Sequence, residues 1–93
     1  MDKNEKQVPV KIEDKILKGV YANAMQVAHT KEEFVLDFMN LFPPQGIVTA
    51  RIVTSPGHLK RIIAALLENI GKYEQVYGRI EEAAAPAADI KFN

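Results

Sequence analysis

The chain of 93 residues contains no cysteine. Disulfide bonds, zinc sites built from thiolates and cysteine nucleophiles are therefore excluded. The chain also has no excess of either charge, because 12 Lys and Arg balance 12 Asp and Glu. Proteins that bind duplex nucleic acid usually carry a basic excess or a basic stripe, so this balance makes nucleic acid an unfavoured partner without excluding it.

Long apolar runs are missing as well. No apolar segment follows the charged start MDKNEKQ, so the sequence predicts no signal peptide, no membrane span and a cytoplasmic location. What is present is an ordinary globular composition, 47% hydrophobic and 26% charged, at a length that suits one domain. A domain of this size buries only roughly 60–65% of its surface, and self-association is a common way to bury more.

The pattern of apolar residues predicts the element order β-β-β-α. Alternation with period two and β-branched residues predict strands over residues 20–28, 33–42 and 47–54. Polar turns are expected over 29–32 and 43–46, with Gly46 at a positive φ. The predicted fold is thus an α+β domain with an antiparallel sheet of three to four strands followed by one long C-terminal helix.

The ends of the chain receive separate predictions. Residues 8–18 hold short alternations and Pro9, which is compatible with an edge strand or an arm. Residues 1–7 are expected to be disordered, residues 8–80 to form the single domain, and residues 81–93 to form a flexible tail.

The helix has clear start and stop signals. Ser55 is a favourable N-cap, Pro56 is favoured at the first helical position, and Gly78 suits the position after the last turn. Gly71 inside the helix is expected to permit close contact with another element. One apolar stripe recurs at spacings of three and four and comprises Leu59, Ile62, Ile63, Leu66, Ile70, Tyr73 and Tyr77.

The second strand, FVLDFMNLF, places a carboxylate among apolar residues. When Phe38 is paired with Ala50 on the third strand, Asp37 falls beside Arg51. A shift of one residue would instead oppose Asp37 to Ile52, so the first register is chemically better. Asp37 is therefore interpreted as one half of a structural ion pair rather than as a catalytic acid. The same register puts Met39 beside Thr49, and the preceding turn pairs Val27 with Phe34 and Met25 with Leu36.

This register divides the sheet into two predicted faces. The predicted inner face, which the helix stripe is expected to cover, comprises Tyr21, Met25, Val27, Phe34, Leu36, Phe38, Val48, Ala50 and Ile52. It also includes Asn23, opposite Phe38, whose buried amide is expected to form hydrogen bonds with backbone groups or with groups near Tyr21. The predicted second face comprises Ala22, Ala24, Ala28, Val35, Met39, Leu41, Ile47 and Val53 with Gln26, Asp37, Thr49 and Arg51.

One helix cannot cover both faces of a sheet. The favoured interpretation is that the predicted second face packs on another copy of the protein, and the alternative is that it stays half exposed. The candidate interface residues are Ala24, Val35, Asp37, Met39, Arg51 and Val53.

Other candidate chemistry is weaker. The exposed amides of a helix N-terminus next to a basic pair suggest an anion site at Ser55, Gly57, Lys60 and Arg61, although an ordinary capped helix explains these residues better. His29 and His58 have no ligand-like partners apart from Glu32 and Glu33 after His29, so no metal site is predicted. Ser55 and His58 lack an orienting acid, so no catalytic residues and no cofactor are predicted.

The stretch from Tyr21 to Gly78 resembles the bacterial and archaeal family called domain of unknown function 3467. The resemblance is carried by YANAMQVAHTKEEFVLDF (21–38), by the proline-containing turn (43–46) and by ARIVTSPGHLKRIIAALLENIGKYEQVYG (50–78). Many members have glycine where this chain has Met39, which implies an altered bulge in the second strand. The family has no established activity to carry over, so the resemblance implies a compact cytoplasmic module and no site residues.

Three function classes remain, none of them enzymatic. The favoured class is a homo-oligomeric interaction or assembly protein whose partner is another copy of itself. The alternatives are a single-stranded nucleic-acid-binding protein that uses sheet residues with Lys60, Arg61 and Lys72, and a peptide-binding, chaperone-like module that uses the predicted second face.

Overall fold

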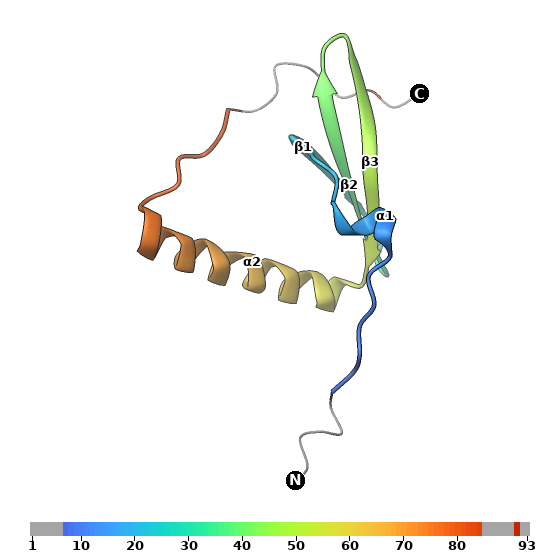
Figure 1. The fold of residues 1–93 in the computed structure, drawn as a ribbon. Helices are drawn as coiled ribbons and strands as arrows, with labels where there is room; N and C mark the ends of the chain where they lie inside the picture. The colour runs from blue at the N-terminus through green and yellow to red at the C-terminus, as the bar shows by residue number, and fades with distance from the viewer. Residues whose placement is uncertain (1–6, 85–90, 92–93) are drawn as a thin grey trace.

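The structure is a computed structural model that describes residues 7–84 and residue 91. A single-turn helix comes first, then three strands, then a long helix (Figure 1). The sheet is antiparallel with the order β1-β2-β3, so both β1 and β3 are edge strands. The elements are α1 (Asp14–Leu17), β1 (Ala24–His29), β2 (Phe34–Phe42), β3 (Gln45–Thr54) and α2 (Pro56–Tyr77).

The predicted β-β-β-α order and the α+β class are confirmed, with shifted boundaries. β1 begins at Ala24 rather than at residue 20, and β3 begins at Gln45 rather than at residue 47. The edge-strand alternative for residues 8–18 is wrong, because this segment is an exposed arm that contains only the turn of α1.

The register between β2 and β3 confirms the charge argument. Phe38 pairs with Ala50 and Asp37 pairs with Arg51, as predicted. Beyond Phe38 the prediction fails, because the register shifts between Phe38 and Met39 and Met39 pairs with Val48 instead of Thr49. Thr49 is therefore the extra residue of a bulge in β3, and its hydroxyl donates to the Phe38 carbonyl at 3.1 Å. The shift also moves Val48 off the predicted inner face.

The register between β1 and β2 differs from the predicted one by two residues. Val27 pairs with Leu36 and Met25 with Phe38, where Val27 with Phe34 and Met25 with Leu36 had been expected. A shift of two keeps every side chain on its face, so the apolar pattern does not distinguish the two registers.

Asn23 fixes the beginning of β1. Its side-chain amide donates to the Leu41 carbonyl at 3.0 Å, and its side-chain oxygen accepts from the Leu41 backbone N–H at 2.8 Å. The predicted hydrogen bonds to backbone are thus confirmed. The predicted position is not, since Asn23 is exposed and its own N–H donates to the Met39 carbonyl.

The turn between β2 and β3 also departs from its prediction. It is centred on Pro43 and Pro44, which are joined by a cis peptide bond, and Gly46 lies within β3 without a positive φ. Glycine is favoured at position 46 for a different reason, the close approach of another side chain. A Cβ there would collide with the Leu41 side chain on the paired strand.

α2 begins and ends where the sequence predicts. Ser55 is the N-cap, with φ −79° and ψ 157°, and its hydroxyl accepts from the His58 N–H at 3.1 Å. Pro56 opens the first turn, and Gly78 follows the last residue with φ 93°. A positive φ at this place favours glycine.

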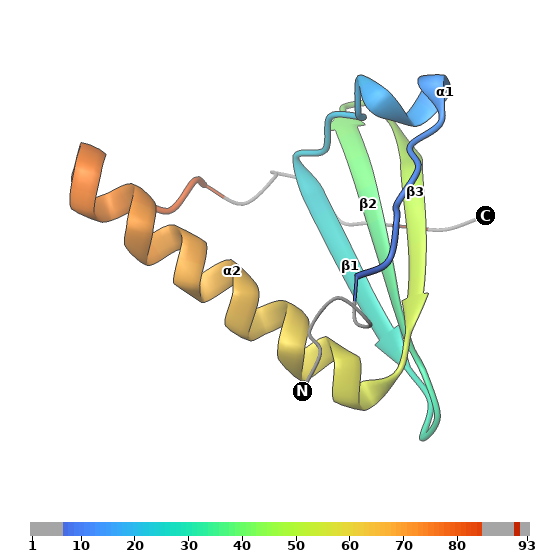
Figure 2. The same cartoon turned by 60° about the horizontal axis from the view of Figure 1, so that its bottom comes forward.

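The prediction that α2 covers the sheet is wrong for the single chain. α2 leaves the end of β3 and runs away from the strands (Figures 1 and 2), and no residue of α2 is buried. The Cα radius of gyration is 16.9 Å, whereas a compact chain of this length has about 12 Å. Among the described residues only Leu36, Met39 and Asp37 are buried. The chain therefore has almost no core of its own.

The predictions for the two ends fall largely on residues 1–6, 85–90 and 92–93, which lie outside the described residues. Residues 78–84 follow α2 without regular secondary structure. The proposed domain limits at residues 8 and 80 stay predictions.

Candidate interaction surfaces

The sheet presents two faces, which follow from the observed pairing because cross-strand partners share a face and successive residues alternate. We call the first the phenylalanine face, which comprises Met25, Val27, Phe34, Leu36, Phe38, Ala50 and Ile52. We call the opposite one the carboxylate face, which comprises Ala24, Gln26, Ala28, Val35, Asp37, Met39, Val48, Arg51 and Val53.

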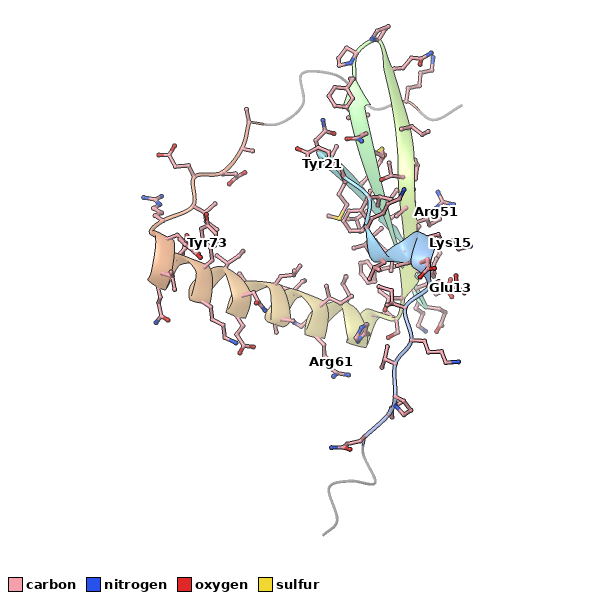
Figure 3. All side chains as sticks on the ribbon, in the orientation of Figure 1. Glu13, Lys15, Tyr21, Arg51, Arg61 and Tyr73 are labelled. Carbon is pink, nitrogen blue, oxygen red and sulfur yellow. The ribbon has the colours of Figure 1, made fainter. Side chains whose placement is uncertain are left out.

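The phenylalanine face is apolar and open. Leu36 at its centre is 8% exposed, but Met25, Val27 and Ile52 around it are 45–48% exposed. In Figure 3 the Arg51 side chain, on the other face, lies on the side of β3 away from α2. The phenylalanine face is therefore directed towards the side of the sheet on which α2 extends, without contact that buries either.

The six predicted interface residues come together on the carboxylate face as three cross-strand pairs. Ala24 pairs with Met39, Val35 with Val53, and Asp37 with Arg51. Met39 is 2% exposed and Asp37 6%, whereas Val53 is 51% exposed. The carboxylate face thus has buried side chains at its centre, on β2, and exposed apolar side chains on β3.

Asp37 and Arg51 form a bidentate ion pair. Arg51 donates from Nε to Asp37 Oδ1 at 2.6 Å and from a terminal guanidinium nitrogen to Oδ2 at 2.8 Å. The Arg51 hydrogen bonds and positive charge lower the pKa of Asp37 despite partial desolvation, and the carboxylate in turn raises the pKa of Arg51. Both groups are therefore charged at neutral pH. Both Asp37 oxygens are engaged by Arg51, which supports a structural role rather than an acid–base role.

A double-mutant cycle tests this pair. Asp37→Ala is expected to weaken stability or assembly, because it leaves the Arg51 guanidinium without its partner. Arg51→Ala should lower the free energy of unfolding by more than the truncation of an ordinary surface side chain. It leaves the Asp37 carboxylate, which is only 6% exposed, without a hydrogen-bond partner. The loss in the double variant, measured by urea denaturation at one fixed concentration, should be smaller than the sum of the single losses. Fully additive losses would contradict the pairing.

The apolar stripe of α2 is the third surface. Ile63, Leu66, Ile70 and Tyr73 are 43–60% exposed, and Tyr77 is 74% exposed. The rings of Tyr73 and Tyr77 lie 4.9 Å apart between centroids. Such an exposed apolar stripe is unusual on a helix in water, because helices in proteins gain most of their stability by packing an apolar face. Nothing lies within 4 Å of a Cβ at Gly71, so the close contact predicted there is not made within the chain.

The candidate anion site lies at the N-terminus of α2 and stays a prediction. The Ser55 hydroxyl is occupied by the His58 N–H, and Gly57, Lys60 and Arg61 are exposed. Lys72, which the nucleic-acid alternative used, lies 3.5 Å from Glu68 one turn earlier. Figure 3 shows Arg61 at the start of α2, remote from the Arg51 side chain. The structure therefore does not join the basic residues into one surface with the sheet.

In the part of the chain that the structure describes, the histidines and carboxylates do not gather into one cluster of three or more. His29 packs beside the Phe34 ring, with 5.2 Å between centroids. Within residues 7–84 and at residue 91, no group of three or more metal-ligating side chains occurs. No helix of the same residues is both long enough and apolar enough to cross a membrane.

Sequence reasoning missed the openness of the stripe and of the phenylalanine face. The periodicity identified both surfaces correctly, but it does not say whether they meet within one chain. The signal that points to their separation is the connection, because a single residue, Ser55, joins β3 to α2.

A fold of three antiparallel strands followed by a C-terminal helix, with unpartnered apolar surfaces, defines the chain as a small α+β module. The sequence model of the family described as "Protein of unknown function (DUF3467)" matches residues 1–82. The chain belongs to this family, and the match extends further towards the N-terminus than the stretch that suggested it. Comparison with curated proteins and with solved structures gave no match.

Proposed function

We propose that this protein is a non-enzymatic assembly module whose first partner is another copy of itself. The observation that carries the proposal is its surface. The accessible area is 8851 Å², whereas a compact monomer of 10.4 kDa exposes about 5,400 Å². Even half of this excess is more than the roughly 800 Å² that each partner contributes to a standard protein interface.

The carboxylate face is the proposed interface between sheets. Ala24 and Ala28 are small and allow close approach of a second sheet, while Val35 and Val53 supply apolar contact. The Asp37–Arg51 pair gives this largely apolar surface a fixed pattern of charge, which selects one register of packing. In this interface Asp37 and Arg51 determine how the two sheets align, and Val53 contributes buried apolar area.

Light scattering coupled to size exclusion tests the proposal. The expected mass is two or four times the 10.4 kDa of the chain, and it should persist at low micromolar concentration in high salt, because the buried area is mainly apolar. Val53→Glu should lower the mass, whereas Lys31→Glu, a charge change in the loop between β1 and β2, should not. A wild-type chain that stays a stable monomer on dilution would overturn the proposal.

The same sample separates the two alternatives. Binding to single-stranded oligonucleotides that weakens steeply with salt would support a nucleic-acid function instead. Binding of unfolded chains by a monomeric protein would support a peptide-binding function.

A further inference from the structure

We propose that two copies exchange their C-terminal helices, so that the apolar stripe of each α2 covers the phenylalanine face of the other copy's sheet. This inference rests on the proposed self-assembly and names the arrangement by which it closes the core. Three observations carry it: the connection between β3 and α2, the match of the two open surfaces, and the excess of exposed area.

The connection holds α2 away from its own sheet. β3 ends at Thr54, which is paired with Phe34, and α2 begins at Pro56, so Ser55 alone joins them. A residue before proline is disfavoured in the α region and biased towards extended conformations, and Ser55 has φ −79° and ψ 157°. The proline ring fixes the next φ as well.

Ser55 is also held by its capping contacts. Its hydroxyl accepts from His58 N–H at 3.1 Å and its carbonyl accepts from Leu59 N–H at 3.0 Å. Both bonds, together with the Pro56 ring, hold the Ser55 ψ angle at its extended value on the α2 side of the connection. With this short and restrained connection, α2 points away from its own sheet in Figures 1 and 2.

The two open surfaces match in chemistry and in size. The stripe offers isoleucine, leucine and tyrosine side chains, and the phenylalanine face offers methionine, valine, phenylalanine and isoleucine side chains. A helix of 22 residues is about 33 Å long, and a strand of 10 residues is also about 33 Å long. A helix from a second copy therefore spans the whole length of the sheet.

The exposed area of the stripe and of the phenylalanine face indicates that a second copy of the chain covers them. An exchanged pair is isologous, because each chain gives one helix and receives one. It buries stripe and face twice, which is the scale of an obligate interface rather than a transient one. The carboxylate face, on the opposite side of the sheet, stays free in this pair, so a second pair seats there and four chains complete the assembly.

Cross-linking between differently sized chains tests the exchange, and the lack of native cysteine makes the labelling specific. One chain carries Val27→Cys on the sheet, and a tagged, longer chain carries Leu66→Cys on α2. The two are unfolded together, refolded and treated with a short bis-maleimide. The expected product is a cross-link between the tagged and the untagged chain. The control replaces Leu66→Cys with Ala64→Cys, which lies about 160° around the helix axis, and should give at least fivefold less product.

The outcomes separate this inference from the proposed function. A chain that carries both Val27→Cys and Leu66→Cys should form its cross-link between chains in the wild-type background. An oligomer whose double-cysteine chain cross-links only within itself would overturn the exchange and leave self-assembly standing. A monomer with the same internal cross-link would overturn both. An oligomer with no cross-link from Leu66→Cys above the Ala64→Cys level would overturn the exchange alone.

Discussion

Replacing Leu66 with alanine is expected to raise the dissociation constant of the assembly by about a thousandfold or more. Leu66 lies at the middle of the α2 stripe and is 60% exposed in the single chain. Under helix exchange it becomes a core residue, and a core Leu→Ala substitution costs about 2–5 kcal/mol. An exchanged pair contains two such sites, so the pair loses at least about 4 kcal/mol, at about 1.4 kcal/mol for each tenfold change.

Sedimentation velocity over a concentration series measures this effect. The matched control is Gln75→Ala, which truncates a side chain about 180° away around the helix axis. An exposed polar residue of this kind contributes within about 0.5 kcal/mol, so the control should keep the wild-type constant. Circular dichroism at the same concentrations shows whether helix content falls together with assembly. Equal dissociation constants for Leu66→Ala and the wild type would contradict a role of the stripe.

Lengthening the connection between β3 and α2 is expected to remove the exchange, so that each α2 covers the sheet of its own chain. Inserting Gly-Gly-Ser after Ser55 keeps a serine before Pro56 and therefore keeps the cap. The added glycines give the chain the backbone freedom that Ser55 lacks. α2 then reaches the phenylalanine face of its own sheet, and the intrachain contact has the advantage of a high effective concentration.

The measurement is the topology of the Val27→Cys and Leu66→Cys cross-link in one chain, which should change from between chains to within one chain. The same three residues inserted after Gly78 form the control, because they lie beyond α2 and leave its connection to the sheet intact. A cross-link that stays between chains in the variant with the longer connection would show that Ser55 and Pro56 do not determine the exchange.

The parts of the fold that were predictable from sequence rest on local chemistry. Ser55, Pro56 and Gly78 have residue-specific backbone and capping preferences, so both ends of α2 were placed correctly. The pairing of Asp37 with Arg51 was predictable because opposite charges on adjacent strands distinguish registers that differ by one residue.

The parts of the fold that were not predictable are strand registers between which the pattern of apolar residues does not distinguish. A shift of two residues between β1 and β2 preserves each face, so Val27 opposite Phe34 and Val27 opposite Leu36 fit equally well. The bulge at Thr49 was not predicted, because threonine is acceptable on either face of a sheet. The bulge is recognised in the structure by the hydrogen bond from the Thr49 hydroxyl to the Phe38 carbonyl.

The covering of the sheet by α2 was the largest error, and its cause is physical. Hydrophobic burial is not directional and depends on area removed from water, whichever chain supplies the covering atoms. The stripe and the phenylalanine face are read correctly as apolar surfaces. Under the proposed exchange, the connection at Ser55 decides whether Leu66 meets the Val27 region of its own chain or of another chain.

The nearly absent core of the single chain has a consequence for any measurement of its resistance to denaturation. Leu36, Met39 and Asp37 are the buried residues of the described chain, and they are too few to hold a sheet and a long helix together. When the native fold exists only in an oligomer, its melting temperature rises with total protein concentration, by mass action. Under the proposed assembly, variants of this protein are comparable only at one total concentration, and the expression level in the cell becomes part of the folding equilibrium.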